Sequence, residues 1–379
     1  MNASNHAPLN VIVVGAGIGG LAATVALRAI GANVSVHEQA RTLARVGAGL
    51  QLAPNSTATL RGLGLLDRVR AVAFRPNAWC SFDAFDGALD LRVPLGDEIE
   101  SQYGAPYLHV HRGDLHDVLM AAVGEIKLNH RVAGIDEQQG RPVVSFTNGD
   151  TATADVVIGA DGVHSMVRES LFGATEATFS GLVAYRGIAP RDRVPDVPPI
   201  AAKWWGGDRH LVHYWVSAGR ELNFVAAVPE PSWDEESWAA EGRTADLLSA
   251  LEQFVEPARH VAGAASTLMR SALYDRDPLA AWSEGTVTLL GDACHPMLPF
   301  MAQGAGMALE DAVVLARCLD GVTTDGVADA LARYAQARIP RTSALQGGSR
   351  ANDFLREANS GLSTEAVYRY DPWRVELPA

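Results

Sequence analysis

Apolar residues follow two patterns along this chain, and each predicts a different kind of element. Largely apolar runs of strand length lie at residues 11–14, 155–158 and 286–290, and each is followed by a glycine-bearing turn. Such runs are typical of strands buried on both faces of a parallel sheet. Between residues 181 and 270, shorter runs rich in aromatic residues alternate with polar ones, which is typical of an antiparallel sheet. The pattern predicts an α/β fold: a Rossmann-like domain with an inserted antiparallel β-sheet domain, followed by C-terminal helices.

The remaining segments complete this outline. Helical start signals and periodicity predict helices after Gly17, from about Asn55, from Arg112 and after Trp233, a long helix over residues 304–319, and more to about residue 359. We expect the other strands at residues 33–37, 79–85, 89–93, 107–111, 126–132, 143–146, 183–188, 202–205, 211–216 and 222–228. Residues 41–55 are predicted as a loop that either follows a cofactor or is an ordinary surface loop. Asn55 is expected to cap the helix after it.

Composition narrows the class of protein. Of the 379 residues, 48% are hydrophobic, which is enough to bury a large core in two joined domains. The formal charge of −13 disfavours nucleic acid and anionic membranes as partners, since both are polyanions. Cys80, Cys294 and Cys318 are far apart and form no CxxC pair, which indicates a reducing compartment. No basic region precedes the first apolar run, so no secretory signal is expected and we predict a cytoplasmic location.

The first apolar run leads into a glycine cluster that has the form of a dinucleotide-binding turn. Residues 11–27 predict a strand, a tight turn and a helix in succession. In this arrangement Gly15 permits the turn, Gly17 lets the backbone approach a pyrophosphate, and Gly20 lets the helix pack close to the strand. The N–H groups at the start of the helix then face the phosphates. Glu38 follows about 20 residues further on, where an acidic side chain accepts hydrogen bonds from ribose hydroxyls.

Two further glycine-and-acid motifs accompany this turn. They are Gly159-Ala-Asp161-Gly162-Val-His-Ser165, and Gly291-Asp292-Ala-Cys-His-Pro296 followed by Gln303-Gly-Ala-Gly-Met-Ala-Leu-Glu310-Asp311. Together the three motifs, over residues 10–345, resemble the single-component FAD-dependent aromatic hydroxylases typified by para-hydroxybenzoate hydroxylase. The segment from Lys203 to Tyr214 is similar to that of the family members that act on 6-hydroxynicotinate, and its last part, from His210 to Tyr214, also resembles those that act on 3-hydroxybenzoate. The salicylate hydroxylases are related to this branch.

The resemblance implies domains, a cofactor and a reaction. Residues 1–75, 105–178 and 270–345 would form the FAD-binding domain, residues 76–104 and 179–269 the substrate-binding sheet, and residues 346–379 a C-terminal helical tail. NADH or NADPH would reduce bound FAD, and O2 would then form a flavin C4a-hydroperoxide. The product would be a hydroxylated form of a phenolic or hydroxylated (hetero)aromatic acid. A homodimer is also an expectation from the family.

The resemblance also implies which residues bind the cofactor. Asp292 would accept hydrogen bonds from the ribityl hydroxyls, although a turn residue at a strand end is the alternative. The helix after Gln303 would direct N–H groups at the negative charge of reduced flavin. The expected cofactor-binding residues are Gly15, Gly17, Gly20, Glu38, Gln39, Gly49, Arg112, Val132, Asp161, Asp292, Gly304, Ala305 and Gly306.

The same resemblance places the substrate on the inserted sheet. His210 and Tyr214 are the predicted catalytic and substrate-binding pair. If His210 begins a strand, Tyr214 lies on the same face four residues later, and either side chain suits relay of a phenol proton. The alternative is a core histidine and a core aromatic residue. Gln51 is a third predicted catalytic residue, and Pro299 and Phe300 are predicted substrate contacts.

Three positions depart from the hydroxynicotinate branch. Gln51 and Phe300 stand where that branch has histidines, and Ala201 stands where it has a cysteine. All three changes remove groups that bind a polar heterocycle, so we expect a more apolar pocket. No position in the sequence identifies the group that binds a substrate carboxylate.

His295 and two rival functions complete the sequence interpretation. His295 lies beside Cys294, but no second ligand pair is found at metal-site spacing, so we predict a structural residue and no metal. His109 and His111 are expected to pack near Arg112. The first rival is a simple NAD-dependent dehydrogenase, which would be colourless where a flavoprotein is yellow. The second is a flavin-binding protein without turnover.

Overall fold

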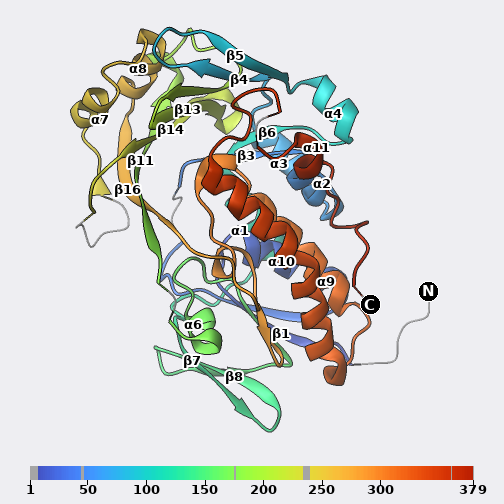
Figure 1. Ribbon diagram of the computed structural model, residues 1–379. Helices are drawn as coiled ribbons and strands as arrows, with labels where there is room; N and C mark the ends of the chain where they lie inside the picture. The colour runs from blue at the N-terminus through green and yellow to red at the C-terminus, as the bar shows by residue number, and fades with distance from the viewer. Residues whose placement is uncertain (1–6, 44–46, 175, 234–239, 360, 379) are drawn as a thin grey trace.

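Two large β-sheets organise the chain (Figure 1). The computed structural model describes residues 7–43, 47–174, 176–233, 240–359 and 361–378. The first sheet has the order β17-β18-β10-β1-β2, in which β18, β10, β1 and β2 run parallel. Its strands are β1 (Asn10–Val14), β2 (Asn33–His37), β10 (Val156–Gly159), β17 (Ser283–Glu284) and β18 (Val287–Leu289). Residues 11–14 and 156–159 are all buried, which confirms the predicted parallel strands.

Helices cover this parallel sheet. α1 (Ile18–Ala29) follows β1 and packs against α5 (Arg112–Val123) and α9 (Gly304–Leu319). The predicted long helix over residues 304–319 is therefore confirmed. α9 is buried over most of its length because α10 (Val327–Ala351) packs on its outer side (Figure 1), which explains why its sequence has almost no polar face.

The second sheet has eight strands in the order β15-β16-β11-β14-β13-β12-β4-β5. They are β4 (Ala78–Asp83), β5 (Leu89–Pro94), β11 (Thr178–Pro190), β12 (Ala201–Gly206), β13 (Arg209–Val216), β14 (Glu221–Pro229), β15 (Ala240–Glu241) and β16 (Thr267–Asp275). The predicted antiparallel sheet is confirmed for most of its strand pairs, whereas β4 pairs with β12 in parallel. β4 reaches this sheet from a distant part of the chain, so no hairpin imposes an antiparallel pairing. α7 (Thr244–Ala250) and α8 (Glu256–Gly263) pack on its outer face (Figure 1).

Shorter elements connect the two sheets. They are β3 (Gly49–Leu52), β6 (Leu108–His111), β7 (Val132–Gln138), β8 (Arg141–Phe146), β9 (Thr151–Thr153), α2 (Pro54–Gly62), α3 (Leu66–Val72), α4 (Asp97–Tyr103), α6 (Met166–Phe172) and α11 (Thr364–Tyr368). Single 3-10 turns follow β18 at Gly291–Ala293 and precede α9 at Pro299–Met301. The predicted domain boundaries remain a prediction, and β16 crosses the one proposed at residue 270.

Three local predictions are wrong. The loop at residues 41–55 contains β3, which pairs with β6 some sixty residues later and so left no local signal; residues 44–46 of that loop lie outside the described residues. Asn55 does not cap α2, since Ala53 occupies that position and Pro54 begins the helix, as proline at a first helical position favours. The strand predicted at residues 126–132 is a single bridge at Lys127, because Asn129 has a φ of 60° and β7 begins only at Val132.

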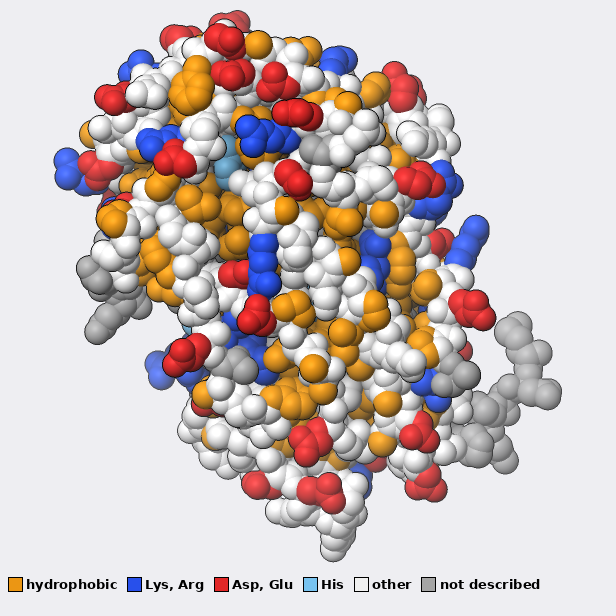
Figure 2. All heavy atoms as spheres, in the orientation of Figure 1, with side chains coloured by type: hydrophobic (Ala, Val, Ile, Leu, Met, Phe, Trp, Pro, Cys, Tyr) orange, Lys and Arg blue, Asp and Glu red, His pale blue; other side chains and the backbone are white. Residues whose placement is uncertain are grey.

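The distribution of surface charge and the apolar character of the helices bear on the expected partners. Figure 2 shows acidic and basic side chains interspersed over the face in view, with apolar side chains between them. Among the helices of the described residues, none combines the length and the apolar character needed to cross a bilayer.

Candidate active site

A cavity of about 570 Å³ extends from the turn after β1 to the inner face of the eight-stranded sheet. Its volume lies within the range of small-molecule sites. Eleven of the predicted site residues line it: Gly17, Gly49, Gln51, Arg112, His210, Tyr214, Asp292, Pro299, Phe300, Gly304 and Ala305. The other predicted residues are not part of its lining: Gly15, Gly20, Glu38, Gln39, Val132, Asp161 and Gly306. The structure thus gathers residues from five separate parts of the sequence around one cavity.

The glycines of the first turn meet two different needs. A Cβ on Gly15 would lie 2.3 Å from the carbonyl oxygen of Ala160, and Gly15 has a φ of +102°. A Cβ on Gly20 would lie 2.1 Å from the carbonyl oxygen of Gly15. A Cβ on Gly17 would have no described atom within 4 Å and would project into the cavity. Gly15 and Gly20 therefore allow the turn to form, whereas Gly17 leaves room for a pyrophosphate, as the FAD interpretation requires.

Two predicted acids are engaged within their own loops. The Glu38 carboxylate accepts hydrogen bonds from the backbone N–H of Ala16 (2.8 Å) and of Ala40 (2.9 Å), so it anchors the turn to the end of β2. Asp161 accepts from the Ser165 hydroxyl (2.6 Å) and the Val167 N–H (3.1 Å), at the start of α6. Asp161 thus shapes its turn, and its neighbour Gly162 lines the cavity.

Asp292 and Arg112 both line the cavity. Asp292 follows β18 and is exposed to the cavity. Surrounding protein raises the pKa of its carboxyl, an effect that His295 and Arg112 oppose. Arg112 begins α5 directly after β6, and its backbone N–H donates to the Ala48 carbonyl (3.0 Å). A hydrogen-bond acceptor and a cation thus both line the cavity, and their roles toward the ribityl hydroxyls and an anionic group of FAD stay predictions.

The start of α9 is held in place by a buried polar network. Asn55 in α2 donates to Gln303 (3.0 Å) and to Glu310 (2.8 Å). Arg338 in α10 pairs with Glu310 (2.8 Å) and Asp311 (2.7 Å), and all three side chains are fully buried. A Cβ on Gly306 would lie 2.5 Å from the Ser56 hydroxyl oxygen, so this glycine lets α9 pack on α2. The network fixes Gly304 and Ala305, whose N–H groups lack helical partners, against the cavity.

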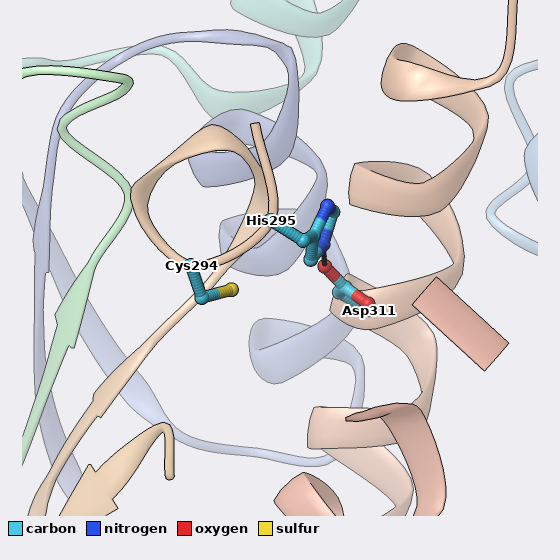
Figure 3. Close-up of side chains that lie close together, drawn as sticks. All are labelled: Cys294, His295 and Asp311. Atoms are coloured by element: carbon cyan, nitrogen blue, oxygen red, sulfur yellow. Dashed lines mark hydrogen bonds and ion pairs between the residues drawn. The ribbon is translucent and has the colours of Figure 1, made fainter. Parts of the chain in front are cut away.

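His295 belongs to the same network. Its Nε2 lies 2.5 Å from Asp311 Oδ2, as the dashed line in Figure 3 shows, and Cys294 lies beside them. Potential ligand atoms of the three residues lie within 4.8 Å of one another, a proximity that sequence spacing did not reveal. However, Asp311 also accepts from Arg338 and the Gly291 N–H, and the Cys294 thiol donates to the Gly291 carbonyl (3.3 Å). Burial also raises the pKa of that thiol, so the structural interpretation of His295 stays the favoured prediction.

The predicted catalytic pair lies on one wall of the cavity. His210 and Tyr214 both come from β13, and both line the cavity, as the two-residue period predicted. The ring of His210 meets Phe300 edge to face at 5.1 Å between centroids. A Cβ on Gly49 would lie 2.6 Å from the Tyr214 ring. Because of this close approach, β3 packs directly against β13 of the eight-stranded sheet.

Burial sets the protonation state of this pair. It lowers the pKa of His210 well below its ordinary value, and nearby Lys203 lowers it further. His210 is therefore a neutral imidazole at pH 7. Burial also raises the pKa of Tyr214, with Arg186 opposing the change. Tyr214 is therefore a neutral phenol that donates a hydrogen bond.

Gln51 and the two histidines predicted to pack near Arg112 lie in β3 and β6, which pair with each other. Gln51 lines the cavity and accepts a hydrogen bond from Tyr107 (2.8 Å). His109 is fully buried against Tyr214, with ring centroids 4.7 Å apart. His111 accepts from the Gly113 N–H at the start of α5. These contacts agree with packing roles for the two histidines.

Sequence reasoning missed two cations on the substrate face. Lys203 of β12 and Arg186 of β11 both line the cavity, yet their strands are separated by β13 and β14. Nothing in the local sequence marks either residue, because only the pairing of distant strands brings them to one face.

We expect a Gly17→Val protein to fold as the native chain does and to bind FAD about ten- to hundredfold more weakly. The new side chain meets no described atom, but it occupies the space assigned to the pyrophosphate. Overpacking of this kind costs about 1–3 kcal/mol, and each 1.4 kcal/mol is about a tenfold change in affinity. Titration of apoprotein with FAD measures the loss.

The matched control is Gly347→Ala. Gly347 lies exposed in α10, and a Cβ added there would have no described atom within 4 Å. This change should therefore leave FAD affinity unaltered and slightly stabilise the helix. Native FAD affinity in Gly17→Val would show that the cofactor does not pass this turn.

Comparisons with known proteins agree over most of the chain. A family model described as FAD binding domain matches residues 8–348. The 6-hydroxynicotinate 3-monooxygenase of Bordetella bronchiseptica is 39% identical over 352 residues, which are 91% of this chain and 92% of that protein. The 3-amino-4-hydroxybenzoate 2-monooxygenase of Streptomyces cremeus is 40% identical over 346 residues, which are 90% and 86%. The crystal structure of Klebsiella pneumoniae HpxO with FAD and uric acid matches with a TM-score of 0.84 and 27% identity, over 93% of this chain and 90% of that one.

Proposed function

Because this chain belongs to the FAD binding domain family of flavin-dependent aromatic monooxygenases, we propose that it hydroxylates a phenolic or hydroxylated (hetero)aromatic acid with O2 and NADH or NADPH. The observation that carries the proposal is the single cavity. It runs from Gly17, at the dinucleotide turn, to His210 and Tyr214 on the substrate face. A flavin held at the turn and an aromatic ring held on the sheet would therefore share one cavity.

The names of two relatives suggest the arrangement of the substrate. In both 6-hydroxynicotinate and 3-amino-4-hydroxybenzoate, as printed for those proteins, the hydroxyl group is opposite the carboxylate on the ring. We propose a substrate of this para type. Phe300, Pro299 and Met297 offer apolar contacts for its ring at the α9 side of the cavity, and Val212 and Val225 offer them on the sheet.

Bound FAD supplies the redox and oxygen-transfer chemistry. The chain's own residues supply position, protons and exclusion of water. Tyr214, as a neutral phenol, donates to the substrate hydroxyl and stabilises the charge that grows there as the ring becomes electron-rich. His210, a neutral imidazole near Lys203, accepts or passes on a proton within the same cavity. Gln51, oriented by Tyr107, supplies a neutral amide to the same space.

Reduced nicotinamide requires its own docking surface, because the dinucleotide turn serves FAD. We propose a second cavity, of about 590 Å³, beside the turn that follows β18. Arg168, Arg276 and Arg350 line it together with Pro296. Guanidinium groups suit a pyrophosphate, and this cavity adjoins the segment that carries Asp292.

The decisive experiment combines reduction and product analysis. The purified yellow protein would be mixed with NADH or NADPH in the presence of 6-hydroxynicotinate, 4-hydroxybenzoate, 3-amino-4-hydroxybenzoate, 3-hydroxybenzoate and salicylate. We expect at least one acid to accelerate flavin reduction, to stimulate O2 uptake and to yield a hydroxylated product by mass spectrometry. Flavin that neither nicotinamide reduces, with no O2 uptake, would favour the non-catalytic flavoprotein, and O2 uptake without any hydroxylated product would contradict the proposed hydroxylation.

Two further expectations belong with this function. We propose a cytoplasmic enzyme, because its three cysteines are buried and unpaired, as in a reducing compartment. A homodimer stays a prediction from the family, and light scattering on the purified protein tests it.

A further inference from the structure

Lys203 is a buried cation on the wall of the substrate cavity. Its side chain extends from β12 and is only 2% exposed. Its Nζ donates to the Asn352 amide oxygen at 2.8 Å and lies 3.7 Å from the centre of the Trp205 ring. The Phe300 ring centre is 5.8 Å away, which places the ammonium beside a predicted substrate contact.

The charge of this ammonium is not balanced by an ion pair. Among the described residues no salt bridge joins Lys203 to a carboxylate; its hydrogen-bond acceptor is the neutral amide of Asn352. Burial, together with nearby Arg356, lowers the pKa of Lys203 well below its ordinary value, and Asp353 only partly opposes this. An ammonium has three donors, and a buried charge is costly unless a counter-ion or hydrogen bonds compensate it. An anionic ligand in the cavity would supply that compensation.

A second cation, Arg186, lies on the same face of the sheet as Lys203 and also lines the cavity. In the sheet register Lys203 lies opposite Val212, Val212 opposite Val225, and Val225 opposite Arg186. The two cations therefore share one row, about 14 Å apart at the backbone by the usual strand spacing, with two valines between them. Arg186 lies near Tyr214 and stabilises its ionised form. This row of four side chains is thus apolar in the middle and polar at both ends.

We propose that Lys203 binds the carboxylate of the aromatic substrate, and that the ring then lies over Val212 and Val225 with its hydroxyl toward Tyr214 and Arg186. This inference rests on the proposed function and names the group that selects acids over neutral phenols. Asn352 holds the ammonium in place through a neutral acceptor, so the carboxylate does not compete with a protein anion. The arrangement matches a substrate whose two polar groups lie opposite each other.

The first test uses the native holoenzyme and matched ligand pairs. The acid that the protein hydroxylates best would be compared with its primary amide, which keeps the ring and hydroxyl but lacks the charge. Ligand-induced changes in the flavin spectrum give the dissociation constants. We expect the acid to bind about ten- to hundredfold more tightly, the range for a hydrogen bond to a charged group.

The second test changes Lys203. Lys203→Met should remove most of that preference by weakening acid binding while leaving amide binding within about twofold, and Lys203→Arg should restore part of it. Lys127 is the only other lysine in the sequence and does not line the cavity, so Lys127→Met is the matched control and should keep the native preference. Retained FAD and an unchanged unfolding temperature show that each variant is folded.

The outcomes separate this inference from the function on which it rests. A native enzyme that hydroxylates an acid and its amide equally well would overturn the role of Lys203 and leave the monooxygenase intact. Equal loss of acid and amide binding in Lys203→Met would assign Lys203 to packing. A native holoenzyme that hydroxylates no member of the panel would instead contradict the proposed function. If Lys203→Met does not fold, the native pair and Lys203→Arg still decide the question.

Discussion

An Arg338→Met protein is expected to be less stable to unfolding than the native chain by about 3–5 kcal/mol. Arg338 is fully buried and pairs with Glu310 and Asp311, which are fully buried as well. Removing one partner of a buried ion pair leaves an uncompensated charge, which typically costs this much. Among the described residues, Glu310 keeps Arg341 and Asn55 as partners, whereas Asp311 keeps only His295 and the Gly291 N–H. Urea denaturation at pH 7 measures the change.

The pH dependence gives this prediction a second readout. Although burial alone would raise it, His295 and Arg338 hold the pKa of Asp311 below its ordinary value. A depressed carboxyl pKa contributes stability above the unfolded value of about 3.9, and that contribution is lost as pH falls through the folded value. The difference between native and variant stability should therefore shrink below about pH 4. Arg333→Met, on the same helix with a single carbonyl contact, is the control; a loss as large as that of Arg338→Met would remove the network from the explanation.

A Tyr214→Phe protein is expected to hydroxylate its substrate at least about a hundredfold more slowly and to keep FAD with less than about a twofold change in affinity. The phenol lines the cavity and stays protonated because its pKa is raised, so the substitution removes a proton donor and little volume. General acid–base groups typically contribute about 10²–10⁴-fold. Single-turnover assays should show normal flavin reduction followed by peroxide release in place of product.

Tyr185→Phe is the control for this experiment. Tyr185 is buried in the same sheet but in the cluster on its opposite face, so both activity and FAD retention should stay near native. Equal losses of hydroxylation and FAD in Tyr214→Phe would mark Tyr214 as a packing residue. Because the pKa of His210 lies well below 6.5, its protonation should leave no inflection between pH 6 and 8 in the hydroxylation rate of the native enzyme.

The parts of the fold that the sequence predicts are those with local signals. The buried runs that became β1, β10 and β18 each combine apolar residues with a following glycine turn, and α9 has a clear beginning at Gly304. β3 was missed because its pairing with β6 depends on residues far along the chain. The parallel pairing of β4 with β12 was missed for the same reason.

The candidate site likewise contains residues that local sequence motifs predict and residues that only distant contacts bring together. Gly17, Asp292, His210 and Tyr214 are recognisable because each belongs to a short motif, and the structure brings all four to one cavity. Asn55 has the sequence context of a helix cap, whereas its bonds to Gln303 and Glu310 cross about 250 positions of sequence. The sequence shows a lysine at position 203 but does not indicate that this lysine lines the cavity. Its position opposite Arg186 exists only once four strands are in register.

The place of β18 in the parallel sheet has a consequence for synthesis of the protein. β10 ends at Gly159, yet the strand that covers its outer edge begins only at Val287. While the chain emerges from the ribosome, the nascent FAD-binding half must keep an apolar strand with an open edge until more than a hundred further residues have been translated. Such an edge invites pairing with other chains. Expression of fragments that stop before residue 287 should therefore yield aggregates, and chaperones that shield exposed strands should act on this protein before its last helices are made.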